Sequence, residues 1–92
     1  MKTKMVRVGR AAIDMRAYDR EMAAGYKAAR KGSRIDAEFH FDHACGIAIV
    51  EREVAKYDAL ARVTWTIAHA AAEAAADTVR KAFNPPVGQV RG

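Results

Sequence analysis

The sequence predicts a small α+β protein that is predominantly helical, ordered as a short strand, a helix, a second strand, a long helix and a short C-terminal tail. Two observations support this prediction. The segment from His43 to Asn84 is rich in alanine, contains no proline and ends before Pro85-Pro86, which predicts a helix of about 40 residues. Residues 35–42 alternate apolar and polar side chains, which is the pattern of a strand with one buried face.

The chain of 92 residues is expected to form one domain, residues 1–84, followed by a tail that starts at the prolines, residues 85–92. Hydrophobic residues make up 51% of the chain and charged residues 29%, which is typical of a folded protein. Cys45 is alone, so no internal disulfide is expected. No apolar run approaches the roughly 18 residues that a membrane span needs, so we expect a soluble cytoplasmic protein.

The N-terminal third predicts a strand and a helix. Residues 4–8 are expected to be a short strand that Gly9 ends. Between residues 11 and 30, apolar residues recur every three or four positions and so share one face of a helix: Ala11, Met15, Tyr18, Met22, Tyr26 and Ala29. Gly32 follows this helix, and we expect it to take the left-handed conformation of a helix C-cap.

Residues 35–42 predict a second strand with one apolar and one acidic face. Asp42 has the side chain of a helix N-cap and is expected to start the long helix. Two strands joined by a helix would pair in parallel through a crossover connection. A two-stranded sheet is too small to be stable alone, so pairing with a strand of another chain is expected.

The long helix is the element that most needs a partner. Forty helical residues span about 60 Å, so a first helix of half that length covers only half of it. Because residues 47–84 contain neither glycine nor proline, a straight helix is the preferred prediction. The alternative is a break near Asp58 or at Thr64–Thr66 that gives a helical hairpin. In the second half, polar residues form one narrow stripe: Asp58, Arg62, Thr66, His69, Glu73, Asp77 and Lys81.

The rest of the circumference of this second half is apolar. Its small alanine side chains let helix axes approach closely, so we predict that it contacts other subunits or a partner protein. The predicted interface residues are Leu60, Val63, Trp65, Ile67, Ala68, Ala71, Ala75 and Val79.

Charge is segregated along the chain, whose net charge is +5. Residues 1–34 hold ten Lys or Arg against three acids, and residues 35–77 hold eight acids against three Lys or Arg. Three interpretations stay open: the basic segment binds nucleic acid, it meets the acidic segment of another copy, or the segments neutralise each other within one chain. The candidate phosphate-binding residues are Lys2, Lys4, Arg7, Arg10, Lys27, Arg30, Lys31 and Arg34.

Metal-ligand side chains crowd together at residues 40–45. His40, His43 and Cys45 are ligand types that zinc accepts, but their spacing matches no established zinc pattern. They are a weak candidate, and a structural role is preferred. His69 and Glu73 are four residues apart, which is typical of a solvated or interfacial helix pair. We predict no catalytic residue, no cofactor and no small-molecule substrate.

These observations favour a non-enzymatic oligomeric component: a structural or assembly protein, or an accessory protein that binds a larger complex. Arginine exceeds lysine by ten to six and there is one Asn, a bias typical of GC-rich genes in some bacteria and their phages. A phage virion protein or phage accessory protein, in the virion or the host cytoplasm, is the class we expect. The alternative function is non-specific binding of the phosphate backbone of nucleic acid through the basic N-terminal segment.

Overall fold

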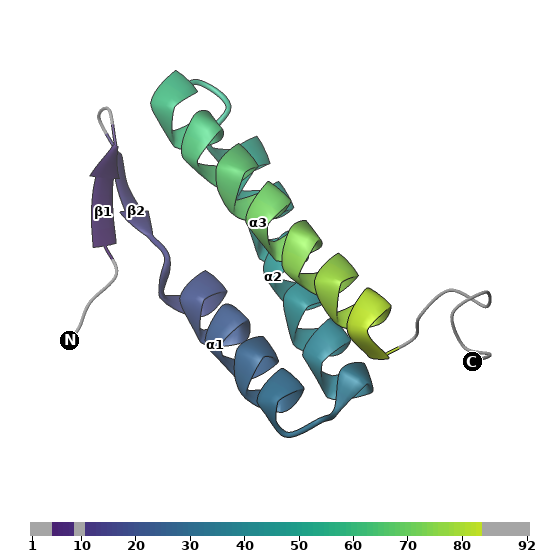
Figure 1. Cartoon of the computed structure of the whole chain (residues 1–92). Helices are drawn as coiled ribbons and strands as arrows, with labels where there is room; N and C mark the ends of the chain where they lie inside the picture. Colours follow the sequence, from purple (N-terminus) through teal and green to yellow (C-terminus); the bar gives the residue numbers. More distant parts are fainter. Residues whose placement is uncertain (1–4, 9–10, 84–92) are drawn as a thin grey trace.

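The computed structural model describes residues 5–8 and 11–83 of the chain. The described residues form a β-hairpin and three helices (Figure 1). In order these are β1 (Met5–Val8), β2 (Ala11–Asp14), α1 (Arg16–Arg30), α2 (Arg34–Val54) and α3 (Ala59–Phe83). The prediction of a predominantly helical protein is confirmed, whereas the order of the elements and the lengths of the helices differ from the prediction. The expected tail, residues 85–92, lies outside the described residues.

β1 and β2 pair as an antiparallel hairpin, in which Met5 lies opposite Asp14 and Val8 lies opposite Ala11. The predicted parallel pairing is therefore wrong, and so is the prediction that a helix starts at residue 11. α1 begins only after Asp14, because its carboxylate accepts hydrogen bonds from the backbone N–H of Arg16 at 3.0 Å and from the Arg16 guanidinium at 2.9 and 2.6 Å. These local bonds stabilise the turn from strand to helix.

The connection between α1 and α2 uses the glycine that the sequence predicts. Gly32 has a φ of +85°, the left-handed conformation that glycine adopts without steric cost. Its N–H donates to the carbonyl of Ala29 at 3.0 Å, and the N–H of Ser33 donates to the carbonyl of Ala28 at 2.9 Å. Ser33 then starts α2, because its hydroxyl accepts a hydrogen bond from the N–H of Asp36 at 3.4 Å.

The segment predicted as the second strand is the start of α2, so this prediction is wrong. Ile35 and Phe39 are 70% and 63% exposed, although alternation would place them on the buried face of a strand. The buried residues instead follow the helical repeat through the whole of α2: Ala37, Phe41, Ala44 and Ala48. Asp42 lies in the middle of α2 and is exposed, so it is not the N-cap of a long helix.

The predicted long helix is interrupted at residues 55–58, and α2 and α3 run antiparallel to each other (Figure 1). The prediction of one straight helix is wrong, and the alternative hairpin is present. Asp58 starts α3, because its carboxylate accepts a hydrogen bond from the N–H of Ala61 at 3.1 Å and its carbonyl accepts one from the N–H of Arg62 at 2.9 Å. A side-chain cap therefore lets the chain reverse without glycine or proline.

The core between the helices is built largely from alanine. The buried residues of α3 are Ala61, Trp65, Ala68, Ala72, Ala76 and Val79. They face the alanines of α2, and small side chains on both helices allow a close approach. α1 joins this pair through Tyr18, whose hydroxyl donates to the carbonyl of Ala68 at 2.7 Å and whose ring meets Trp65 edge-on at 6.0 Å.

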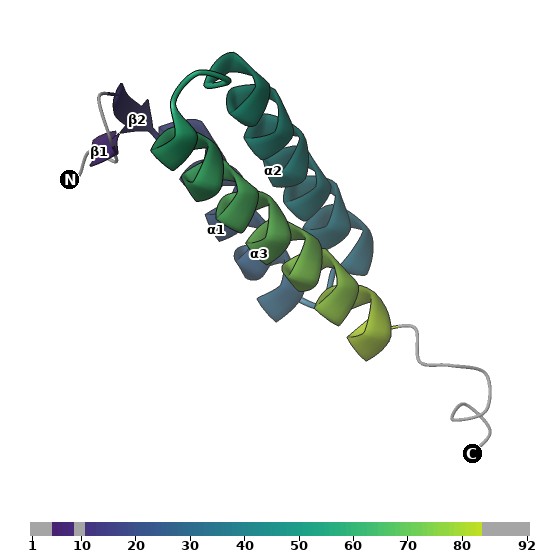
Figure 2. The ribbon, with the colours of Figure 1, turned by 90° about the horizontal axis from the view of Figure 1, so that it is seen from above.

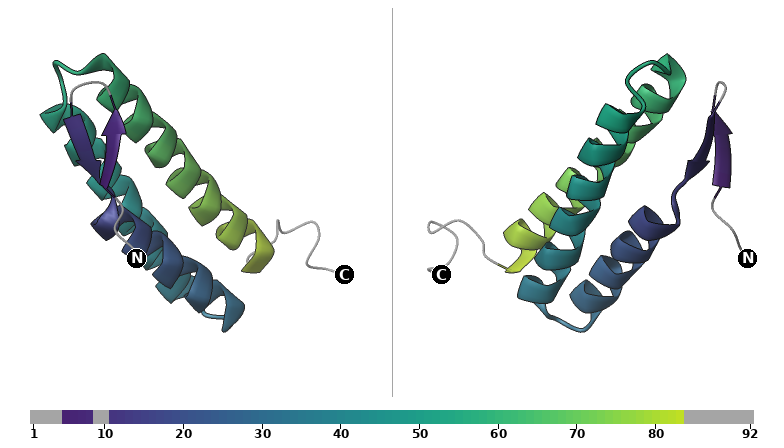
Figure 3. Two further views of the ribbon diagram at one scale, coloured as in Figure 1. Left: turned by 90° about the vertical axis from the view of Figure 1, so that its left-hand side faces the viewer. Right: turned by 180° about the vertical axis from the view of Figure 1, so that it is seen from behind.

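In the described part of the molecule, α2 packs against both α1 and α3, and the arrangement as a whole is elongated (Figure 2 and Figure 3). Its radius of gyration is 15.2 Å, against about 12 Å for a compact chain of this length. Among the described residues, no helix or strand covers the outer sides of α2 and α3. Two of the candidate surfaces described below lie on these outer sides of α2 and α3.

Gly25 of α1 provides a test of the close packing. A Cβ at this position would lie 2.5 Å from Cε1 of Phe41, so we expect Gly25→Ala to lower the free energy of unfolding by about 1–3 kcal/mol. Gly46→Ala is the matched control, because an added Cβ there meets no atom within 4 Å and should raise stability by about 1 kcal/mol. Urea unfolding measures both, and equal effects of the two substitutions would contradict the packing.

Candidate functional site

The predicted interface residues of α3 divide between two opposite sides of the helix. Trp65, Ala68 and Val79 are buried in the core of this chain, where they pack inward and not against another subunit. Ala75 is half-buried. The remaining four are exposed: Leu60, Val63, Ile67 and Ala71. The sequence pattern does not separate the two sides, because α3 is apolar on both.

The exposed side of α3 carries a line of apolar residues, which we name the outer α3 strip: Leu60, Val63, Ile67, Ala70 and Ala74. Their spacing of three and four residues places them on one side of the helix. Leu60, Val63 and Ile67 are 57%, 54% and 64% exposed. No member of the strip is charged, and the carboxylates of Glu73 and Asp77 lie at its edge. This surface suits an apolar partner.

A second apolar line, the outer α2 strip, follows the side of α2 that faces away from the core: Ile35, Phe39, Val50 and Val54. All four side chains are more than half exposed. Asp42 and His43 are exposed between the two halves of this strip. The outer α2 strip is therefore divided by polar groups, whereas the outer α3 strip is continuous.

A carboxylate and two imidazoles meet between α1 and α2. Nδ1 of His40 lies 2.8 Å from Oε1 of Glu21, and Nδ1 of His43 lies 3.3 Å from Oε2 of the same carboxylate. The hydrogen bond to His40, followed by that to His43, holds the pKa of Glu21 below its ordinary value. Nothing in the sequence indicates this cluster, because Glu21 is 19 residues from His40. The cluster fastens α1 to α2.

The three residues of the weak zinc candidate do not come together. His40 and His43 face Glu21 of α1, whereas the thiol of Cys45 lies 4.0 Å from the carbonyl oxygen of His69 on α3. Burial raises the pKa of the Cys45 thiol, which disfavours the thiolate that zinc binds. Among residues 5–8 and 11–83, no group of three or more His, Cys, Asp or Glu side chains is arranged to hold a metal ion.

The candidate phosphate-binding residues fall into three groups. Three of them lie outside the described residues: Lys2, Lys4 and Arg10. Arg7 is in β1. Four lie where α1 ends and α2 begins: Lys27, Arg30, Lys31 and Arg34. The guanidinium of Arg34 lies 3.1 Å from one carboxylate oxygen of Glu38 within α2, and Arg80 of α3 lies 3.6 Å from the other, so it is the pair of Glu38 and Arg80 that joins α2 to α3.

The outer side of α1 carries a line of cations, the basic α1 line, of which the predicted set contains only a part: Arg16, Arg20, Lys27, Arg30 and Lys31. All five side chains are exposed, and their spacing places them on one side of the helix. The predicted set omits Arg16 and Arg20. Arg16, Arg20 and Lys27 follow one another at four and seven positions, about one and two helical turns. This spacing is the signal that would have added Arg16 and Arg20 to the set. Arg16 is also paired with Asp14 at 2.6 Å.

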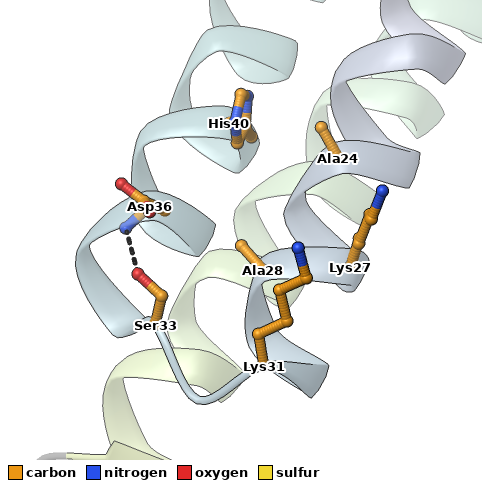
Figure 4. A pocket seen from close by; sticks show the side chains of 7 residues that line it. All are labelled: Ala24, Lys27, Ala28, Lys31, Ser33, Asp36 and His40. Atoms are coloured by element: carbon orange, nitrogen blue, oxygen red, sulfur yellow. Dashed lines mark hydrogen bonds between the residues drawn. The ribbon is translucent and has the colours of Figure 1, made fainter.

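An open hollow of about 250 Å³ lies between the last turn of α1 and the first turn of α2 (Figure 4). Its lining includes Lys27 and Lys31 on one side and Ser33, Asp36 and His40 on the other. The two lysines favour an anion, and the carboxylate of Asp36 opposes one. The hollow therefore extends the basic α1 line and is not a separate binding site.

Comparison with protein-family models, with curated proteins and with solved structures finds no match to this chain. None of the helices in the described part of the chain is long and apolar enough to cross a membrane. The candidate surfaces are the outer α2 strip, the outer α3 strip and the basic α1 line.

We expect Glu21→Gln to lower the free energy of unfolding by about 1–2 kcal/mol near neutral pH, because it removes a hydrogen-bonded charge between two helices. The folded pKa of Glu21 lies below its unfolded value, which is about 4.3. The stabilisation is therefore present above that pH and is lost as the pH falls through the folded pKa.

Urea unfolding of the wild type and the variant, from about pH 7 down to about pH 2, measures this effect. Glu73→Gln is the matched control, because Glu73 is an exposed carboxylate of α3. The difference in stability between wild type and Glu21→Gln should narrow in acid. A difference that stays constant with pH would contradict the role of the carboxylate.

Proposed function

We propose that this chain is a non-enzymatic, self-assembling structural or interaction component, which binds copies of itself and a larger protein complex through the outer sides of α2 and α3. The balance of large hydrophobic side chains carries the proposal. Among residues 13–82, whose burial the structure describes, ten are exposed, against five that are buried: Ile13, Tyr18, Phe41, Trp65 and Val79. A chain this small needs most of its apolar surface to build a core, so such exposure favours burial against another chain.

Covering the outer α3 strip contributes a useful free energy. Full burial of a valine, leucine or isoleucine side chain contributes about 1.5–3 kcal/mol. Leu60, Val63 and Ile67 are each more than half exposed, so a partner that covers them adds roughly 1 kcal/mol for each side chain. The total is a substantial fraction of the roughly 5–15 kcal/mol by which small domains are stable.

Two unlike apolar strips favour a component with more than one neighbour. The outer α3 strip is continuous, and the outer α2 strip is divided by Asp42 and His43. A chain with two different apolar sides can bind a different neighbour through each, as the subunits of larger assemblies do. A phage virion protein, or a phage accessory protein in the host cytoplasm, is the class we propose.

The basic α1 line favours a second candidate function, which is non-specific binding of the phosphate backbone of nucleic acid. Its cations extend over 16 residues from Arg16 to Lys31, or about 22 Å of helix. Phosphate contacts need Lys and Arg on a common surface, and this line provides one. The line lies on α1 and the apolar strips lie on α2 and α3, so the two functions are compatible.

Ile67→Lys tests the proposed self-assembly. Ile67 is exposed in the single chain, so the variant should fold, but a buried unpaired ammonium is incompatible with an apolar contact. We expect wild-type protein to have a solution mass of at least twice the 10.1 kDa of one chain, and the variant to have the mass of one chain. Light scattering after size exclusion measures the mass, and circular dichroism verifies the fold.

Thr66→Lys is the matched control for this experiment. Thr66 is the neighbouring exposed residue of α3 and lies outside the outer α3 strip. This variant should keep the wild-type mass. A variant Ile67→Lys that also keeps the wild-type mass would refute the proposal that this strip forms the contact.

Replacing Lys27 and Lys31 by Gln tests the second function. Each phosphate contact contributes about 0.9 to the slope of log affinity against log salt for duplex DNA. The double variant should therefore weaken binding of a fluorescent duplex and reduce the slope by up to about 2. Lys56→Gln/Lys81→Gln removes the same charge away from α1 and is the control. Equal losses in the two double variants would exclude a site on the basic α1 line.

A further inference from the structure

The outer α3 strip is graded in size along the helix. Its N-terminal half holds the large residues Leu60, Val63 and Ile67, and its C-terminal half holds Ala70 and Ala74, followed by the exposed Thr78. The residues are three or four positions apart, which is the repeat of two helices that pack along a shared line. The strip therefore has the spacing of a surface that pairs with another helix. Its side chains are large at the N-terminal end and small at the C-terminal end.

We propose that the outer α3 strip binds the same strip of a second copy, with the two α3 helices antiparallel. The two-fold axis is perpendicular to the helices and crosses the contact at the level of residues 68 and 69. This inference rests on the self-assembly proposed above and names the partner. In this arrangement Leu60 faces Thr78 of the second copy. Val63 faces Ala74 of the second copy, and Ile67 faces Ala70.

Antiparallel pairing matches the two strips in volume. Each large side chain meets a small one, so the distance between the helix axes stays constant along the contact, within the 8–10 Å of packed helices. A parallel pair would set Leu60 against Leu60 and Ala74 against Ala74. The helix axes would then diverge at one end or enclose a void at the other, and close packing opposes both.

The charges at the edge of the strip favour the same arrangement. Arg62 and Asp77 belong to the polar stripe along one edge of the outer α3 strip. The proposed axis brings Arg62 of one copy to within about 3 Å of the level of Asp77 of the other along the helix. These opposite charges attract. A parallel pair would place the polar edges of the two copies on opposite sides of the contact, so this attraction between Arg62 and Asp77 would be absent.

The other surfaces of a second copy fit the outer α3 strip less well. The basic α1 line presents cations separated by alanines such as Ala23, so it has no large apolar side chain to cover Ile67. The outer α2 strip has the exposed carboxylate of Asp42 in its middle, and a continuous apolar strip would bury this charge without a partner. The outer α3 strip itself is the surface that matches in both polarity and size.

Distances between spin labels on the two copies test the orientation. Ala82 and Thr66 are exposed residues of α3 outside the strip, and each is replaced in turn by a labelled cysteine in a Cys45→Ala background. Pulsed electron paramagnetic resonance then measures the distance between the same position in two copies. From the helical rise, we expect about 40 Å for Ala82→Cys and less than about 20 Å for Thr66→Cys.

The outcomes separate this inference from the function on which it rests. A dimer mass with a long distance at Ala82→Cys and a short one at Thr66→Cys supports the antiparallel pair. A dimer mass with short distances at both positions means parallel helices and overturns the inference, while self-assembly stands. Wild-type protein with the mass of one chain, and no dipolar coupling at either label, overturns both.

Discussion

The reversal of the chain at residues 55–58 is the constraint on which the rest of the structure depends. The cap at Asp58 starts α3 there, and α3 folds back along α2 so that their alanines face each other. Because alanine fills little volume, the two helices come close together and few large side chains are needed between them. Phe41 and Trp65 provide the bulk inside, against Gly25 and Tyr18 of α1. Val79 is also buried, and most of the other large apolar residues of both helices are left outside.

This packing divides the described part of the molecule into surfaces of different chemistry. α1 is held to its neighbours by two polar contacts, the carboxylate of Glu21 with two histidines and the hydroxyl of Tyr18 with a carbonyl of α3. It therefore covers one side of α2 and turns its cations to solvent. The outer sides of α2 and α3 remain apolar. A chain that stabilises itself with alanine and presents leucine, valine and isoleucine outward is suited to association, and this is the physical basis of the function we propose.

Local patterns predicted the helical character, the conformation of Gly32 and the excess of apolar surface on α3, because each depends on neighbours in sequence. The strand at residues 35–42 was wrong because alternation assumes that apolar residues are buried, and Ile35 and Phe39 are exposed in the outer α2 strip. The straight helix was wrong because the lack of glycine and proline outweighed the capping signal of Asp58. Which side of α3 is buried, and which residues meet Glu21, could not be predicted, because both depend on contacts between segments that are distant in the sequence.

The most direct test of the central claim is the solvent accessibility of the outer α3 strip in the wild-type protein. Methyl-resolved NMR with a soluble paramagnetic probe reports it for single side chains. The methyl groups of Val63 and Ile67 should be protected as strongly as those of the buried Val79, although they are exposed in the single chain, while those of Val54 should broaden. Broadening of Val63 and Ile67 equal to that of Val54 would show that no second copy covers this side of α3, and would contradict the account.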